Sequence, residues 1–132
     1  NNISCFSFKD YFTICVDTGH SNKAVLYGQP SSADVIRRLG KNISVLHLND
    51  NNKLKDQHKI PMTGDLDWKD IMDALEEVGY DGYYNMEVNL GWFGPDMLEE
   101  TAAFAIKVMK NILKENRNIK ICKRTWANGC IT

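Results

Sequence analysis

Apolar positions along the chain follow two different periods. Short runs rich in β-branched and aromatic residues occupy residues 11–16, 43–48 and 83–88, and each run predicts a strand. Three further segments, which begin near residues 32, 68 and 96, space their apolar side chains as a helix does. Strands that alternate with helices are typical of parallel βα units, so the pattern predicts an α/β fold.

The predicted helices have recognisable ends. Ser31 and Asp67 are N-cap candidates, because a short polar side chain accepts hydrogen bonds from the free N–H groups of the first turn. Gly40 and Gly79 follow the last apolar positions of these two helices and predict their ends. The last helix follows Gly94-Pro95-Asp96. Its apolar stripe consists of Leu98, Ala102, Ala105, Ile106, Met109, Ile112 and Leu113.

Length limits how much of a fold the chain can form. A chain of 132 residues with 43% apolar residues predicts one domain with a modest core. Three strands and three helices do not close a (β/α)8 barrel, which takes about 250 residues. Residues 116–132 show no amphipathic period, and we expect them to form a poorly ordered tail.

Charge and cysteine usage argue against several partners. Sixteen basic and 17 acidic residues leave a net charge of -1, without the basic excess that nucleic acid or an anionic membrane attracts. No apolar run approaches the roughly 20 residues that span a bilayer. The cysteines form no CxxC pair, so we expect reduced thiols in a cytoplasmic protein. They are Cys5, Cys15, Cys122 and Cys130.

Six side chains that can ligate a metal lie at or just after the predicted strand ends or in the polar loop at 50–65. They are Asp17, His20, His47, Asp56, His58 and Glu87. A mixture of carboxylate and imidazole suits Zn, Mn, Co or Fe(II) better than Ca or Mg alone. Because the C-terminal ends of parallel barrel strands face one mouth, we expect Asp17, His47 and Glu87 to converge. The loop that carries Asp56 and His58 is then able to fold over that mouth.

Three other side chains lie near these candidates in the sequence, and two of them, Asp50 and Trp92, have two possible roles each. Asp50 either orients an imidazole at the site or shapes the turn at Asn51-Asn52. Trp68 is expected in the core, at the start of its helix. Trp92 follows the third predicted strand, where it either stacks on a sugar ring or simply packs.

Several motifs together resemble the C-terminal half of the xylose isomerase-like TIM barrel superfamily. They are Asp17-Thr18-Gly19-His20, His47-Leu48-Asn49-Asp50-Asn51, Asp56-Gln57-His58, Gly64-Asp65-Leu66-Asp67-Trp68, Gly79-Tyr80-Asp81-Gly82 and Glu87. This superfamily includes sugar phosphate isomerases and epimerases and, more distantly, the endonuclease IV type of DNA repair enzyme. The resemblance implies a partial (β/α)8 TIM barrel over residues 1–115, about the last three βα units with parallel strands.

The resemblance also implies roles for the six side chains. Asp17, His47 and Glu87 match metal ligands of the family's epimerases, whose further glutamate, from strand five, has no counterpart here. His20 matches a residue that contacts substrate in epimerases and ligates metal in the endonuclease IV type. Asp56 and His58 match a pair that holds a further zinc in the latter type, so here they bind either metal or substrate. One departure is Pro61-Met62-Thr63-Gly64, where the family usually has Pro-Gly-x-Gly.

The implied activity is a metal-dependent sugar or sugar-phosphate isomerase or epimerase of carbohydrate metabolism. The expected cofactor is a divalent metal, Mn, Zn, Co or Mg, which stabilises an enediolate. Glu87 and His20 are the expected catalytic residues, and His20, His58 and Trp92 are expected to bind the substrate. Because the second glutamate is missing, we expect this chain alone to be incomplete.

Two alternatives stay open at this point. One is an endonuclease IV-like zinc phosphodiesterase acting on abasic DNA, which the near-neutral charge disfavours. The other is an inactive or assembly-dependent half-barrel. The expected partners are a small sugar or sugar phosphate, and either a second copy of the chain or a complementing N-terminal half; no membrane or nucleic acid is expected.

Overall fold

The computed structural model describes residues 12–115, so the predicted tail at 116–132 lies outside the described residues. A two-stranded parallel sheet lies at the centre, formed by β1 (Ile14–Asp17) and β2 (Ile43–His47). The register pairs the last residue of β1 with the last residue of β2, so both strands end at the same level. This arrangement confirms the predicted α/β class with parallel strands.

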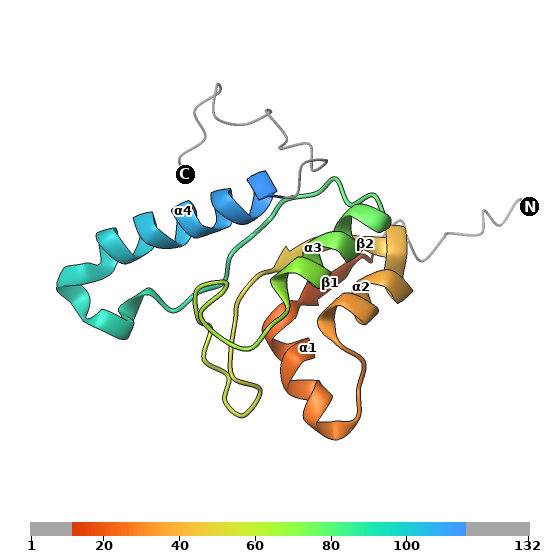
Figure 1. The fold of residues 1–132 in the computed structure, drawn as a ribbon, viewed down its shortest axis with the longest axis horizontal. Helices are drawn as coiled ribbons and strands as arrows, with labels where there is room; N and C mark the ends of the chain where they lie inside the picture. The colour runs from red at the N-terminus through yellow and green to blue at the C-terminus, as the bar shows by residue number, and fades with distance from the viewer. Residues whose placement is uncertain (1–11, 116–132) are drawn as a thin grey trace, which may run out of the picture.

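Two of the predicted helices begin directly after their predicted N-cap residues. α2 (Ser32–Leu39) is capped by Ser31 and ends at Gly40, as predicted. α3 (Trp68–Glu77) is capped by Asp67, whose side chain accepts from the third residue of the helix. Figure 1 shows α2 and α3 side by side, together covering one face of the strands. Their buried side chains join Val16, Ile43, Leu46 and Leu48 in one apolar core.

A short helix that the apolar pattern did not predict follows β1. α1 (Thr18–Ala24) has no apolar stripe, and its buried residues are Thr18, Gly19 and Asn22. The carboxylate of Asp17 caps it by accepting the backbone N–H of His20 at 2.8 Å. Polar contacts with the segment after β2 replace the apolar face that a sequence pattern detects, which is why the helix was missed.

The prediction of a regular third strand at 83–88 is wrong. This segment makes only isolated parallel bridges to the β2 side, at Val45 with Tyr83 and at Leu48 with Met86. Leu48 donates to the carbonyl of Asn85 at 2.8 Å. Among the described residues no strand pairs with the other edge of the segment, so hydrogen bonds from one side hold it beside β2 without a continuous ladder.

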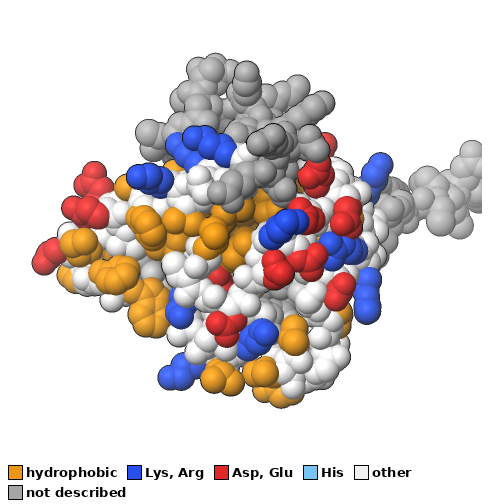
Figure 2. Space-filling view, in the orientation of Figure 1, with side chains coloured by type: hydrophobic (Ala, Val, Ile, Leu, Met, Phe, Trp, Pro, Cys, Tyr) orange, Lys and Arg blue, Asp and Glu red, His pale blue; other side chains and the backbone are white. Residues whose placement is uncertain are grey.

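α4 (Leu98–Glu115) follows two 3-10 turns, Leu90–Phe93 and Pro95–Met97. Only part of its predicted stripe is buried: Ala105, Met109 and Ile112 are, whereas Leu98 and Ile106 are each 44% exposed. In Figure 1 the C-terminal end of α4 lies nearer the sheet than its N-terminal end. Hydrophobic side chains accordingly gather on the surface around α4 (Figure 2). In the described part of the chain, none of the helices has the length and apolar character to cross a membrane.

Candidate functional site

The first group of candidate ligands forms where the parallel segments end. Asp17 and His47 are register partners at the ends of β1 and β2. Glu87 lies beside them because its backbone N–H donates to the carbonyl of Leu48 at 3.1 Å. The Nδ1 atom of His47 lies 2.8 Å from Oε2 of Glu87 and 4.0 Å from Oδ2 of Asp17. The three side chains offer ligand atoms that all lie within 4.8 Å of one another.

A second group adjoins the first. His20, Asp56 and His58 also offer ligand atoms within 4.8 Å of one another. The Nε2 atom of His20 lies 3.0 Å from Oδ2 of Asp56, and Nε2 of His58 lies 3.6 Å from Oδ1 of the same carboxylate. On its other side, Nδ1 of His20 lies 3.0 Å from Oδ2 of Asp17. The imidazole of His20 therefore joins the two groups.

The electrostatics of the second group favour an ion-paired state. Burial alone would raise the pKa of Asp56, but the hydrogen bond with His20 and the charges of His20 and His58 lower it overall. The pKa of His58 is raised, first by its hydrogen bond to the carbonyl of Glu87 and then by the charge of Asp56. A protonated imidazole cannot ligate a metal, so a metal ion could bind His58 only if it displaced the proton.

The loop that carries Asp56 and His58 is held against the third segment. His58 has a φ of 46°, a left-handed conformation that is uncommon for a residue other than glycine. Its ring Nδ1 lies 2.9 Å from the carbonyl of Glu87, and its own carbonyl accepts from Asn89 at 2.7 Å. A strained backbone held by such contacts is common at functional sites.

Asp50 anchors the same loop and does not orient a histidine. Its buried carboxylate accepts from the indole N–H of Trp68 at 2.8 Å and from the backbone N–H of Asn51 at 2.8 Å. Its backbone pairs with Lys59 in an antiparallel bridge. The turn-shaping reading of Asp50 is therefore the one that the contacts support, and the expected burial of Trp68 is confirmed at 5% exposure.

Met62 stands where the family usually has glycine, and its backbone has the conformation that glycine favours. Met62 has a φ of 69°, although it is not glycine, and its side chain is exposed. Gly64 is required for space, because a Cβ there would lie 2.2 Å from Oδ1 of Asp50. Met62 therefore adopts this left-handed conformation at a cost in backbone strain.

Trp92 lies at the rim of the site and contacts the loop. It is 53% exposed, and its indole N–H donates to the carbonyl of Gln57 at 3.3 Å. This contact places the ring beside the segment that carries Asp56 and His58. Its predicted stacking on a sugar stays a prediction.

Sequence reasoning overlooked a set of buried amides beneath the first group. Asn49 and Asn51 are 0% exposed, and Asn22 is 6% exposed. Asn51 donates to the carbonyl of Gly19 at 2.8 Å, and Asn22 donates to the side chain of Asn51 at 3.0 Å. The concentration of amides directly after His47 was the available signal, but only Asp50 was singled out there.

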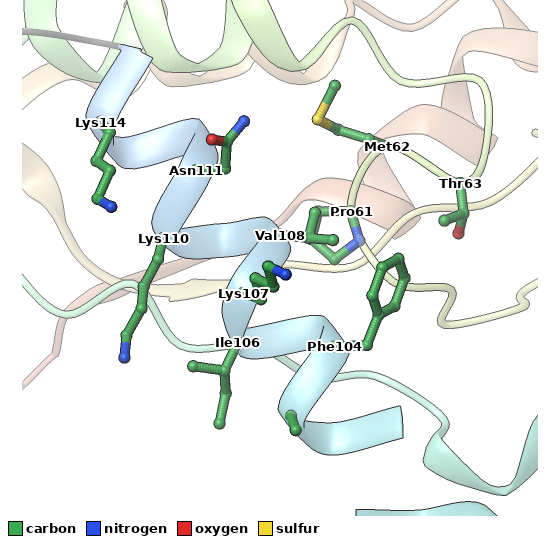
Figure 3. Close-up of a pocket in the computed structure, with 11 residues that line it drawn as sticks. Pro61, Met62, Thr63, Phe104, Ile106, Lys107, Val108, Lys110, Asn111 and Lys114 are labelled. Atoms are coloured by element: carbon green, nitrogen blue, oxygen red, sulfur yellow. The ribbon is translucent and has the colours of Figure 1, made fainter. Parts of the chain in front are cut away.

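A separate cavity lies away from the two ligand groups. It has a volume of about 620 Å³ and lies between α4 and the loop at 61–63 (Figure 3). Phe104 and Val108 line it together with the side chains of Pro61 and Met62. None of the six candidate ligands lines this cavity, so the site is defined by its ligand groups and not by the cavity.

Carboxylates and imidazoles at the ends of neighbouring parallel segments are the arrangement found at the mouth of a TIM barrel. The sequence matches the family model described as xylose isomerase-like TIM barrel over residues 5–116. The chain belongs to this family, which confirms the resemblance seen in its motifs.

The similarity to known relatives covers only part of the length of each relative. D-psicose 3-epimerase of Enterocloster bolteae is 35% identical over 74 residues, which cover 56% of this chain and 22% of that protein. Uncharacterized protein y4fM of Sinorhizobium fredii is 32% identical over 78 residues, which cover 59% of this chain and 24% of the relative. The chain thus spans about a quarter of the length of these relatives.

Solved structures support the partial barrel. A D-tagatose 3-epimerase-like protein superposes with a TM-score of 0.65 at 24% identity, covering 86% of this chain and 39% of the other. A xylose isomerase domain protein from Planctomyces limnophilus gives a TM-score of 0.62 at 19% identity, covering 80% and 39% respectively. At these identities the likeness shows the fold alone, and it confirms a portion of a TIM barrel.

Proposed function

We propose that this chain forms the C-terminal part of a metal-dependent sugar or sugar-phosphate isomerase or epimerase. The observation that carries the proposal is the convergence of Asp17, His47 and Glu87 within 4.8 Å at the ends of adjoining parallel segments. The matched D-psicose 3-epimerase supports the choice of substrate class.

The donor set fits a divalent cation. Two carboxylates and one imidazole are ligands that Zn, Mn and Co accept, and the side chains of His47 and Glu87 remain 38% and 47% exposed. A cation held by Asp17, His47 and Glu87 would supply positive charge beside the carbonyl and hydroxyl oxygens of a sugar. The ion's identity stays open between Mn, Zn, Co and Mg.

In this proposal Glu87 moves the proton. Its carboxylate takes a proton from the carbon next to the substrate carbonyl, or returns one to it. The exposed imidazole of His20 contacts the substrate from α1, and His58 or Trp92 contacts it from the loop side. A second carboxylate is needed on the opposite face to invert a carbon, and the strand-five glutamate that serves the family's epimerases has no counterpart among the matched motifs.

Solvent exchange is the test suited to a single carboxylate, because one base suffices to remove and return a proton. We expect the chain, incubated with Mn²⁺ and D-psicose in D₂O, to catalyse exchange of the sugar's C3 hydrogen with solvent. The loss of the C3 signal in ¹H NMR spectra measures this exchange. Glu87→Gln should abolish exchange, whereas Glu76→Gln, on the exposed side of α3, should retain it. Exchange that persists in Glu87→Gln would show that Glu87 is not the base.

A second candidate function is favoured by the group of His20, Asp56 and His58. The endonuclease IV type clusters several zinc ions, and two adjoining ligand groups suit that arrangement. The test is incision of a duplex that contains one abasic site, in the presence of Zn²⁺. Absence of incision under conditions where sugar exchange occurs would reject this candidate.

The third candidate is a half-barrel that needs assembly. In the part of the chain that is described, β1 pairs with β2 alone, and no strand covers the outer edge of residues 83–88. We propose that either a complementing N-terminal half or a second copy covers these edges. Intact mass and native size of the protein from its source distinguish the two partners. The cytoplasmic location expected from the sequence stays a prediction.

A further inference from the structure

A buried amide lies directly behind the carboxylate of Asp17. Asn49 follows β2 by two residues and is 0% exposed. Its backbone is held by Thr18, whose hydroxyl accepts from the N–H of Asn49 at 3.1 Å and donates to its carbonyl at 2.8 Å. Because Thr18 is the neighbour of Asp17 in sequence, these bonds fix Asn49 relative to that carboxylate.

The two oxygens of Asp17 have different surroundings. Oδ1 accepts from the side-chain amide of Asn49 at 3.1 Å and from the backbone N–H of His20 at 2.8 Å. Oδ2 faces the imidazoles instead, at 3.0 Å from Nδ1 of His20 and 4.0 Å from Nδ1 of His47. Both donors therefore occupy the same oxygen and leave the other directed at the ligand groups.

The buried amide of Asn49 costs folding free energy. Among the described residues, its Oδ1 has no hydrogen-bond donor, although it is buried. A buried polar atom without a partner destabilises a fold relative to an apolar side chain of the same shape. Exchanging the amide oxygen and nitrogen would place oxygen against the carboxylate of Asp17, so the N–H must point at Asp17.

The local backbone makes room for this amide. A Cβ at Gly19 would lie 1.8 Å from Oδ1 of Asn49 and 3.0 Å from Nδ2 of Asn51. Any larger residue at position 19 would therefore displace the side chain of Asn49. Gly19 lies between Asp17 and His20, so the space for the amide comes from the same turn that carries the candidate ligands.

We infer that Asn49 is a positioning residue for the metal centre: it holds Oδ1 of Asp17 so that Oδ2 is presented to a divalent cation. The inference rests on the proposed metal site and adds a residue that does not itself touch the ion. Hydrogen bonds that orient a ligating carboxylate raise metal affinity, and losing one commonly weakens binding by about 10–100-fold.

The test is a titration of the full 132-residue chain with Co²⁺, followed by visible absorption, which reports both affinity and coordination geometry. Asn49→Ala should weaken Co²⁺ binding about 10–100-fold and change the absorption bands. Asn22→Ala is the matched control, because Asn22 belongs to the same buried amides but donates to Asn51 and not to Asp17. It should leave the affinity and the bands unchanged.

Thermal unfolding in EDTA separates positioning from a general loss of structure. A comparable fall in melting temperature for both variants, with loss of affinity in Asn49→Ala alone, supports the inference. Equal loss of affinity in both variants, or unchanged affinity in Asn49→Ala, overturns it. Gly19→Ala, which displaces the amide without removing it, should reproduce the Asn49→Ala spectrum, and a wild-type spectrum would count against the inference. If the wild-type chain binds no Co²⁺, the proposed metal function fails as well.

Discussion

The ring of His58 lies against the backbone of Glu87, with 2.9 Å between Nδ1 and the carbonyl oxygen. A carbonyl only accepts, so Nδ1 carries the proton, and Nε2 is directed toward Asp56 at 3.6 Å. One imidazole thus ties the loop to the third parallel segment and turns its other nitrogen toward the second ligand group. Both contacts stabilise the protonated ring and raise the pKa of His58.

This raised pKa predicts a pH-dependent contribution to stability. Since the folded pKa of His58 lies above its ordinary value of 6.5, the protonated ring stabilises the fold fully below that value. The contribution disappears as pH rises through the folded pKa. In EDTA, the melting temperature of wild type should exceed that of His58→Gln by more at about pH 5.5 than at about pH 8.5. A difference that does not vary with pH would contradict the role of the charged ring.

Removing an imidazole from the first group should lower the metal content. His47→Ala deletes a candidate ligand and should weaken Mn²⁺ or Zn²⁺ binding by at least about 10-fold. Val45→Ala shortens a half-exposed side chain on the same strand and should bind metal as the wild type does. Metal content measured by mass spectrometry after dialysis is the readout, and unchanged occupancy in His47→Ala would exclude it as a ligand.

Asp50 and Trp68 should contribute to stability as a coupled pair. Asp50→Asn replaces an acceptor of several N–H groups with a side chain that can accept fewer, which should cost about 1–3 kcal/mol in the free energy of unfolding. Trp68→Phe removes the indole donor from the same contact, so the two effects should be non-additive by about 0.5–3 kcal/mol. Urea denaturation measures both.

The control for that pair is Asp65→Asn, at an exposed position in the same loop, which should change the free energy of unfolding by less than about 0.5 kcal/mol. Additive effects of Asp50→Asn and Trp68→Phe would show that their hydrogen bond contributes little. In that case the loop would be held mainly by the backbone bridge between Asp50 and Lys59.

The backbone at positions 62 and 64 predicts opposite outcomes for two exchanges with glycine. Met62→Gly should stabilise the fold by up to about 1 kcal/mol, since a left-handed φ costs other residues about 1–2 kcal/mol and glycine's extra chain entropy offsets part of the gain. Gly64→Ala should destabilise it strongly, because the added Cβ would approach Oδ1 of Asp50 to 2.2 Å. Melting curves compare them, and a destabilised Met62→Gly would mean that the Met62 side chain makes contacts that outweigh the strain.

Local signals were sufficient for the elements that depend on nearby residues. Ser31 and Asp67 cap their helices as predicted, because an N-cap interacts with N–H groups only a few residues away. α1 was not predicted because its polar buried face meets the segment after β2, more than 25 residues later in the chain. The strand predicted at 83–88 forms only bridges, since strand regularity depends on partners on both edges.

By itself the sequence determined the α/β class, the ends of α2 and α3, and the six side chains to consider as ligands, because these depend on short-range periods and on residue chemistry. Only the tertiary structure decided how the six divide into two groups joined by His20, and that Asn49 lies behind Asp17. The physical reason is distance along the chain: Asp17 and Asn49 are 32 residues apart, and their contact follows from the parallel pairing of β1 and β2.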